Sequence, residues 1–66
     1  MVNFGINVLK TREKLKISQK QLADTVGITQ SMVCQIEKNA KIPNVIVGYE
    51  IAKALNTTVD NLCKGA

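Results

Sequence analysis

The sequence feature that most restricts the fold is a pair of helix signals separated by one glycine turn. Ser18, followed by Gln21 three residues later, forms a capping box, which is a helix start signal. Gly27 ends that helix, because glycine readily takes the left-handed backbone conformation that follows a helix end. Thr29 can cap a second helix only two residues later. The chain must therefore turn sharply between two short helices.

The rest of the sequence predicts further short helices. Phe4, Val8 and Leu15 fall on one helix face, which Ile6 and Leu9 widen. The other residues expected at helix ends are Asn3, Asn39, Asn44 and either Thr57 or Thr58. No segment shows the alternation of a strand, so we predict five helices, over residues 3–16, 18–26, 29–38, 45–55 and 59–63.

The predicted core consists of the apolar residues that face inward in these helices. Beyond the first helix they are Leu22, Ala23, Val26, Ile28, Val33, Ile36, Val47, Ile51, Ala52 and Leu55. Gly48 lies inside the fourth helix, where glycine costs about 1 kcal/mol relative to alanine. A close contact with another helix would justify it.

Length and composition exclude several classes of protein. The 66 residues allow one domain with a small core, and no apolar run approaches the roughly 20 residues of a membrane span. There is no His, no Gly-rich phosphate loop and no secretory signal, and the two cysteines do not form a zinc pattern. We expect a cytoplasmic protein with reduced thiols that is not an enzyme and needs no cofactor, metal, membrane or small-molecule ligand.

The charge balance permits a polyanionic partner. Nine Lys and Arg against five Asp and Glu give a net charge of +4. One Phe, one Tyr and no Trp leave few rings on which single-stranded bases could stack. If the partner is a nucleic acid, a double-stranded one is therefore favoured.

The outer face of the third predicted helix is polar and uncharged, where a solvated helix face normally carries Lys and Glu. It consists of Thr29, Gln30, Ser31, Cys34 and Gln35. A Gln side chain can bond to adenine N6 and N7 together, a contact worth about 1–3 kcal/mol of discrimination. The alternative is an ordinary solvated polar face.

Residues 17–38, ISQKQLADTVGITQSMVCQIEK, resemble the helix-turn-helix of the phage repressor and Cro family, also called the XRE family. Arg12 and Glu37 match a family pair that forms a partly buried salt bridge, and residues 51–62 match the family's fourth and fifth helices. The resemblance implies an all-α, lambda-repressor-like bundle of five helices. It spans one domain, residues 1–66, with the helix-turn-helix at about 18–38.

The resemblance also implies roles for individual residues. Base contacts would come from Thr29, Gln30, Ser31, Cys34 and Gln35, although the family often has larger polar residues in place of Ser31 and Cys34. Gln19 would contact a phosphate and brace the third helix, and Asn39 and Lys41 would meet the DNA backbone. Charge and a helix N-terminus add further phosphate contacts at Lys20, Lys38 and Asn44.

These assignments predict a sequence-specific, double-stranded DNA-binding transcriptional regulator, most commonly a repressor. One short helix reads few base pairs, so we expect a homodimer on a pseudo-palindromic operator. The predicted dimer interface consists of Val45, Ile46, Val59, Leu62 and Cys63. The alternative is a protein-interaction module, such as an antitoxin-type or regulator-binding helical domain. The polar residues of the third helix favour DNA, because protein interfaces prefer apolar and aromatic side chains.

Overall fold

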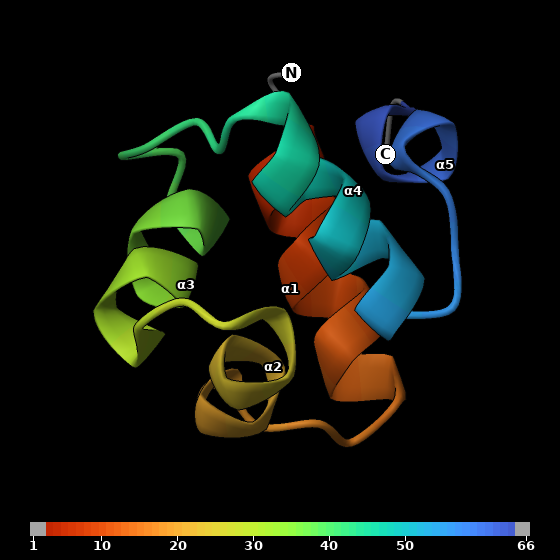
Figure 1. Ribbon diagram of the computed structural model, residues 1–66. Helices are drawn as coiled ribbons and strands as arrows, with labels where there is room; N and C mark the ends of the chain where they lie inside the picture. The colour runs from red at the N-terminus through yellow and green to blue at the C-terminus, as the bar shows by residue number, and fades with distance from the viewer. Residues whose placement is uncertain (1–2, 65–66) are drawn as a thin grey trace.

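The computed structural model describes residues 3–64, which form five α-helices and no strand (Figure 1). The helices are α1 (Phe4–Lys14), α2 (Gln19–Val26), α3 (Gln30–Glu37), α4 (Val45–Ala54) and α5 (Val59–Cys63). The predicted all-α fold is confirmed. Each helix except α5 ends within two residues of its predicted boundary, and α5 matches it.

The turn between α2 and α3 follows the sequence signals. The Ser18 hydroxyl accepts a hydrogen bond from the Gln21 backbone N–H at 3.0 Å, and the Gln21 side chain accepts one from the Ser18 N–H at 2.8 Å. Gly27 ends α2 with φ 84°, in the left-handed region. Thr29 then caps α3 by accepting from the Met32 N–H at 3.1 Å. The capping box and the glycine stop are both confirmed.

The remaining helix ends also follow polar residues. Asn44 caps α4, and Thr58 rather than Thr57 caps α5. Asn39 has φ 60°, the left-handed conformation expected of a residue that follows a helix end. Asn3 precedes α1, but its side chain makes no cap hydrogen bond.

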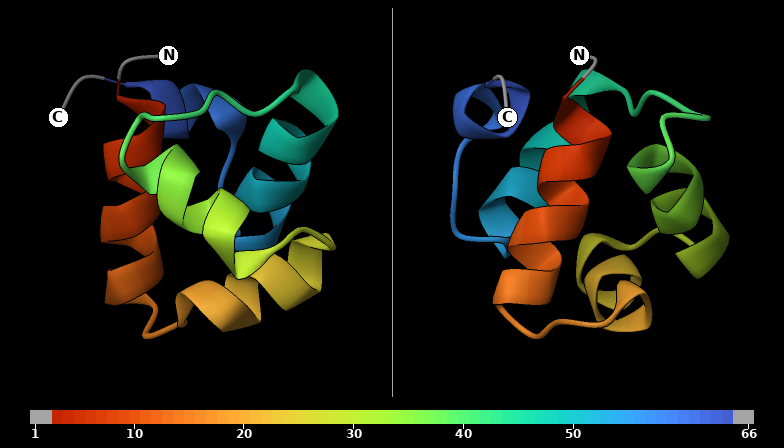
Figure 2. Two further views of the ribbon diagram at one scale, coloured as in Figure 1. Left: turned by 90° about the vertical axis from the view of Figure 1, so that its left-hand side faces the viewer. Right: turned by 180° about the vertical axis from the view of Figure 1, so that it is seen from behind.

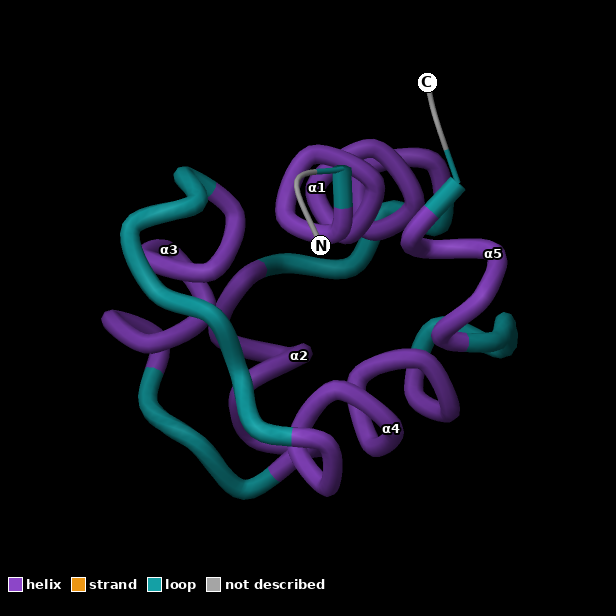
Figure 3. The backbone as a smooth tube through the Cα atoms, turned by 90° about the horizontal axis from the view of Figure 1, so that it is seen from above, coloured by secondary structure: helices purple, strands orange, loops and turns teal. Residues whose placement is uncertain are grey.

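The helices surround a single core, which Figure 3 shows from above. α1 and α4 lie on opposite sides of this core, with α3 and α5 at its two ends. α3 packs on α1 and α2, and α5 packs on α1 and α4. The buried apolar residues are Phe4, Val8, Leu22, Ala23, Val33, Ile36, Ile51, Ala52, Leu55 and Leu62.

Two apolar residues of the first segment are misplaced by the sequence prediction. Leu15 is 46 % exposed and Ile6 is 39 % exposed, so neither belongs to the core face. Leu15 follows the last residue of α1, and the chain reverses at Lys16 with φ 59°. α1 therefore ends before Leu15, so the helical periodicity that predicted a buried Leu15 does not extend to this residue.

Gly5 and Gly48 differ in how much space their surroundings leave for a side chain. A Cβ added at Gly5 would collide with the carbonyl oxygen of Ile36 and lie 2.6 Å from Asn39 Oδ1. Gly5 thus allows α1 to approach the end of α3 closely. A Cβ at Gly48 would meet Phe4 Cζ at 3.9 Å, an ordinary van der Waals distance. The close contact proposed for Gly48 therefore does not account for it.

No helix within residues 3–64 is long and apolar enough to cross a membrane. The same residues contain no cluster of three or more His, Cys, Asp or Glu that could hold a metal ion. Cys34 and Cys63 are half-buried free thiols.

Candidate nucleic-acid interface

Helix α3 has two chemically different sides. Val33 and Ile36 are 1 % exposed and fix the helix to the core. Gln30, Ser31 and Gln35 are exposed on the outer side, as the sequence predicted. The left panel of Figure 2 looks onto this side of the molecule, where α3 lies nearest the viewer. The outer face thus offers amide and hydroxyl groups to a partner without disturbing the core.

Two of the five predicted base-contact residues have additional neighbours or roles. Thr29 is exposed, but its hydroxyl oxygen caps α3, so its methyl group and its hydroxyl hydrogen are left for a partner. Cys34 is half-buried and lies between the inner and outer sides of the helix. These two residues therefore offer less contact surface than the two glutamines.

The C-terminal end of α3 is held by a buried ion pair. Arg12 Nε donates to Glu37 Oε2 at 2.7 Å, and Arg12 Nη2 lies 3.2 Å from Glu37 Oε1. Only 11 % of the Arg12 side chain and 3 % of the Glu37 side chain are exposed. Arg12 Nη1 also donates to the Ile17 carbonyl at 2.8 Å, a contact that the sequence did not predict. The predicted pair is present, and it also ties down the chain that leads into α2.

The contact with Glu37 stabilises the charged form of Arg12. The hydrogen bond with Glu37 raises the pKa of Arg12, and burial lowers it by a smaller amount. The guanidinium therefore stays protonated in the folded protein. A planar, fixed cation that can bond two carboxylate oxygens is suited to hold one helix against another.

Gln19 completes this cluster from the first turn of α2. Its Nε2 donates to Glu37 Oε1 at 2.9 Å, so one carboxylate receives bonds from α1 and from α2. Glu37, the last residue of α3, is thus bonded to the last turn of α1 and to the first turn of α2. These contacts fix the orientation of α3. The half-buried Gln19 side chain keeps one amide hydrogen and one oxygen for another partner.

The loop over residues 38–44 continues the outer surface beyond α3. Lys38, Asn39 and Lys41 are all exposed there. The backbone N–H groups of Ala40 and Lys41 both donate to the Gln35 carbonyl, at 2.8 and 3.2 Å, which fixes the loop to the end of the helix. The two lysines therefore lie next to the outer face of α3 and add positive charge at its edge.

The two other predicted phosphate contacts have partners within the fold. Lys20 Nζ lies 3.3 Å from Asp24 Oδ2, but both side chains are exposed, so the pair is weak and easily exchanged. Asn44 Oδ1 accepts from the Val47 N–H at 2.8 Å and starts α4. Its amide nitrogen is the group left for a phosphate.

The residues predicted for a dimer interface fall into three environments. Val45 and Ile46 are 87 % and 75 % exposed. Val59 and Cys63 are half-buried. Leu62 is 2 % exposed and belongs to the core, so its assignment to an interface is wrong. The five-residue helix α5 buries it against α1 and α4.

Two residues that sequence reasoning missed lie near these. Tyr49 is 61 % exposed on α4, one turn after Val45, and this spacing was visible in the sequence. Asn7 donates through its side-chain amide to the carbonyls of Leu62 and Lys64, at 2.7 and 2.8 Å. These contacts span more than 50 residues, and no local pattern indicates them.

The arrangement as a whole suits a DNA major groove. A groove of about 12 Å width admits one α-helix, and base edges are read by groups that donate and accept hydrogen bonds. α3 presents such groups, and the exposed Lys38 and Lys41 add positive charge beyond its C-terminal end. The buried Val33 and Ile36 and the hydrogen bond from Gln19 to Glu37 keep this outer face of α3 in a defined orientation.

Comparison with known proteins assigns the chain to a family. Residues 8–62 match the helix-turn-helix family HTH_3. The chain is 31 % identical over 55 residues to the uncharacterized HTH-type transcriptional regulator YgzD of Bacillus subtilis, covering 83 % of each chain.

Solved structures agree with this assignment. The P22 c2 repressor protein, determined in complex with a synthetic operator, superimposes with a TM-score of 0.89 at 33 % identity and covers 96 % of both chains. The restriction-modification controller protein C.AhdI of Aeromonas hydrophila superimposes with a TM-score of 0.87 at 26 % identity and covers 92 % of both. The chain therefore belongs to the XRE-type helix-turn-helix family of DNA-binding transcriptional regulators.

Proposed function

We propose that this protein is a repressor that binds a pseudo-palindromic operator as a homodimer, with α3 of each copy in the major groove. The observation that carries the proposal is the exposed, uncharged, hydrogen-bonding outer face of a helix that is otherwise fixed to the core. The complex of the similar P22 c2 repressor with an operator supports it.

The proposal assigns different tasks to the residues around α3. Gln30 and Gln35 read base edges, with Ser31, Thr29 and Cys34 adding smaller contacts. The groups that bind phosphates, and so fix the register of the protein on DNA, come from Gln19, Lys20, Lys38, Asn39, Lys41 and Asn44. The phosphate-binding residues supply affinity that does not depend on the DNA sequence, and the glutamines supply discrimination between DNA sequences.

The number of base pairs that one α3 can contact argues for two copies. An eight-residue helix reads only a few base pairs, which recur too often in a genome to define a site. Two copies on half-sites about 34–36 Å apart define a longer one. Val45, Ile46, Val59 and Cys63 remain the proposed contact residues between the copies.

Selection of bound sequences from a random duplex pool tests the proposal. We expect a half-site, its inverted repeat and a fixed spacing. Gln30→Ala should relax the preference at one position in each half-site and weaken binding to the best sequence by roughly 1–3 kcal/mol. Lys41→Ala should weaken binding to every sequence about equally.

Two outcomes would contradict these assignments. An unchanged sequence preference for Gln30→Ala would remove it from the reading face. A sequence-dependent effect of Lys41→Ala would show that this side chain reads bases rather than phosphates. Lys64→Ala, at the far end of the described chain, is the matched control and should leave both properties unchanged.

A further inference from the structure

The loop between α3 and α4 exposes an isoleucine among polar residues. Ile42 is 70 % exposed, and Lys41 and Asn44 on either side of it belong to the proposed DNA surface. A single exposed apolar side chain is common on protein surfaces, so its exposure alone does not indicate a contact. The position and the surroundings of Ile42 give it a more specific meaning.

The loop faces the same side of the molecule as the outer face of α3. In the left panel of Figure 2, both α3 and the chain that leads from it to α4 lie toward the viewer. The N–H groups of Ala40 and Lys41 donate to the Gln35 carbonyl, which fixes the first half of the loop to the helix. Pro43 restricts the backbone of the second half. A large partner that covers α3 therefore comes within reach of Ile42.

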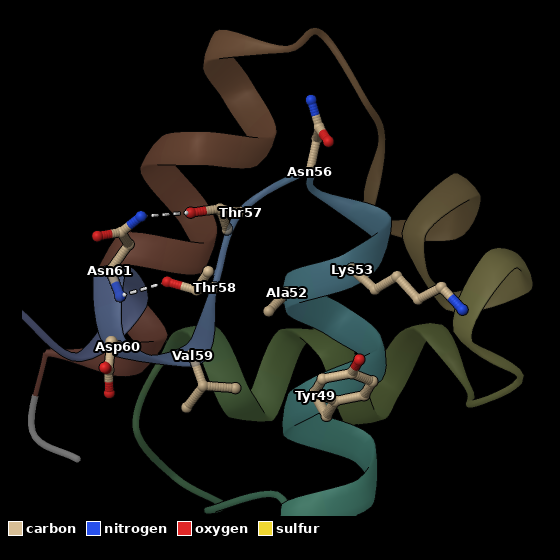
Figure 4. A pocket seen from close by; sticks show the side chains of 9 residues that line it. All are labelled: Tyr49, Ala52, Lys53, Asn56, Thr57, Thr58, Val59, Asp60 and Asn61. Carbon is tan, nitrogen blue, oxygen red and sulfur yellow. Dashed lines mark hydrogen bonds between the residues drawn. The ribbon is translucent and has the colours of Figure 1, made fainter.

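The fold itself offers Ile42 little room. The hollow beside it, which Phe4, Ile36 and Pro43 also line, has a volume of about 10 Å³, enough for one water at most. A groove of about 700 Å³ lies elsewhere, and Figure 4 shows its lining side chains on α4, on α5 and on the segment that joins them. α5 and α3 lie at opposite ends of the core, so that groove cannot receive Ile42 of the same chain. Ile42 can therefore be shielded from water only by another molecule.

We propose that Ile42 packs on a deoxyribose of the DNA backbone, between the phosphates that Lys41 and Asn44 bind. A DNA strand alternates charged phosphates with sugars, and the sugars present apolar C–H groups. The loop has the same order, with a cation at position 41, apolar residues at 42 and 43, and an amide nitrogen at 44. Three residue steps span at most about 10 Å, so positions 41 and 44 can reach neighbouring phosphates of one strand. This inference rests on the proposed function, because it requires α3 to lie on DNA.

Charge favours DNA over a protein as the molecule that covers Ile42. Lys38 and Lys41 are exposed in the same loop, and residues 38–44 include no Asp or Glu. An apolar protein surface would remove water from these lysines without replacing it, whereas phosphates neutralise them. The surface around Ile42 is also continuous with the proposed DNA interface, because the loop is bonded to the end of α3.

The contact would add a component of affinity that differs from those of the lysines and the glutamines. Burial of apolar surface releases no counterions, so salt should not weaken this component as it weakens phosphate binding. Every nucleotide of DNA carries the same sugar, so the component should not depend on the base sequence.

The binding of Ile42→Ala to duplex DNA at several salt concentrations tests the contact. We expect the affinity of each bound copy to fall about five-fold to ten-fold, because alanine buries less apolar surface. The loss should be equal for the operator duplex obtained by selection and for a random duplex. The slope of the logarithm of the binding constant against the logarithm of salt concentration should remain that of the parent, whereas Lys41→Ala should make it shallower.

Two further variants separate the apolar character of the side chain from its shape. Ile42→Val keeps a branched apolar side chain and should bind DNA within about two-fold of the parent. Ile42→Thr has nearly the same shape as Ile42→Val but carries a hydroxyl group, so it should bind more weakly. Equal affinities of these two variants would overturn the packing on the sugar.

Ile6→Ala is the matched control. Ile6 is an isoleucine of α1 that is 39 % exposed and has no part in the proposed DNA surface. Its replacement should change neither the affinity for duplex DNA nor the salt slope. Equal losses of affinity in Ile6→Ala and Ile42→Ala would show that the position of Ile42 does not matter, and would overturn the contact.

DNA binding by the parent protein separates this inference from the function on which it rests. If the parent binds duplex DNA and Ile42→Ala binds it equally well, the sugar contact is wrong and the regulator function stands. If Ile42→Ala changes the preferred sequence, Ile42 contacts a base, and the sugar contact is again wrong. If the parent binds no duplex DNA, the proposed function fails and the sugar contact fails with it.

Discussion

At the residue scale, the described glycines give a graded test of what the fold requires. Gly5→Ala should destabilise the protein most, because its Cβ would strike backbone and side-chain atoms at the end of α3. Gly27→Ala meets no atom within 4 Å, so its cost is only that of a left-handed alanine, about 1 kcal/mol. Gly48→Ala should stabilise the protein by about 0.5–1 kcal/mol, because it gains helix propensity without a clash. Urea unfolding followed by circular dichroism measures all three.

The order of these effects matters more than their size. A destabilised Gly48→Ala variant would mean that α4 and α1 pack more tightly than the 3.9 Å contact indicates. A Gly5→Ala variant as stable as the parent would mean that α1 can move away from α3 without loss.

The Glu37 carboxylate gives a second residue-scale prediction. Glu37→Ala leaves the guanidinium of Arg12 nearly buried without its partner, and it also removes the acceptor for Gln19. We expect a loss of about 2–4 kcal/mol of unfolding free energy, a large part of the stability of a domain this small. Denaturant unfolding measures it.

The control is the exposed pair of Lys20 and Asp24. Asp24→Ala should change the unfolding free energy by less than about 0.5 kcal/mol, because solvent screens that pair. Similar losses in the two variants would show that burial does not decide the strength of these ion pairs.

At the element scale, α5 depends on a long-range contact. It has five residues, too few to persist in isolation, and is fixed by Leu62 in the core and by the two hydrogen bonds from Asn7. Asn7→Ala should therefore speed amide hydrogen exchange throughout α5 while the amides of α2 and α3 stay protected.

Asn3→Ala provides the matched control. Asn3 is the same residue type at the start of the same helix, and its side chain makes no cap hydrogen bond. It should leave exchange in α5 unchanged. Equal exchange rates in the parent and Asn7→Ala would show that Leu62 alone holds the helix.

The helix pattern was predictable because its signals are local. The capping residues Ser18 and Thr29 indicate where α2 and α3 begin, and Gly27 indicates where α2 ends. In the structure these residues lie at those helix ends. The placement of Leu15 and Leu62 was not predictable in this way. Leu15 depends on where α1 ends, and Leu62 on how a short terminal helix turns toward the core.

The candidate site was predictable to a similar degree. The outer face of α3 follows from helical periodicity, and the pair of Arg12 and Glu37 from the family resemblance. The hydrogen bonds from Gln19 to Glu37 and from Asn7 to α5 join residues distant in the sequence. They follow only from the three-dimensional packing of the helices.

At the scale of the whole molecule, the number of phosphate-binding lysines predicts the response of binding to salt. If two copies each neutralise phosphates through Lys20, Lys38 and Lys41, the logarithm of the binding constant should fall with the logarithm of salt concentration with a slope of about −5. Lys41→Ala should make this slope shallower by about one for each copy. Fluorescence anisotropy with labelled random duplex DNA measures it.

This measurement also decides between the two classes of function. A protein-interaction module without DNA binding would show no salt-dependent affinity for duplex DNA. A flat salt response with normal folding would therefore remove the regulator proposal and favour a protein partner.

The two-sided construction of α3 has a consequence for how such proteins diversify. Val33, Ile36 and Glu37 maintain the fold, whereas Gln30, Ser31 and Gln35 face outward on the same eight-residue helix. Mutations can therefore accumulate on the outer positions with little thermodynamic penalty, and new target preferences can arise by drift and selection without passing through unfolded intermediates.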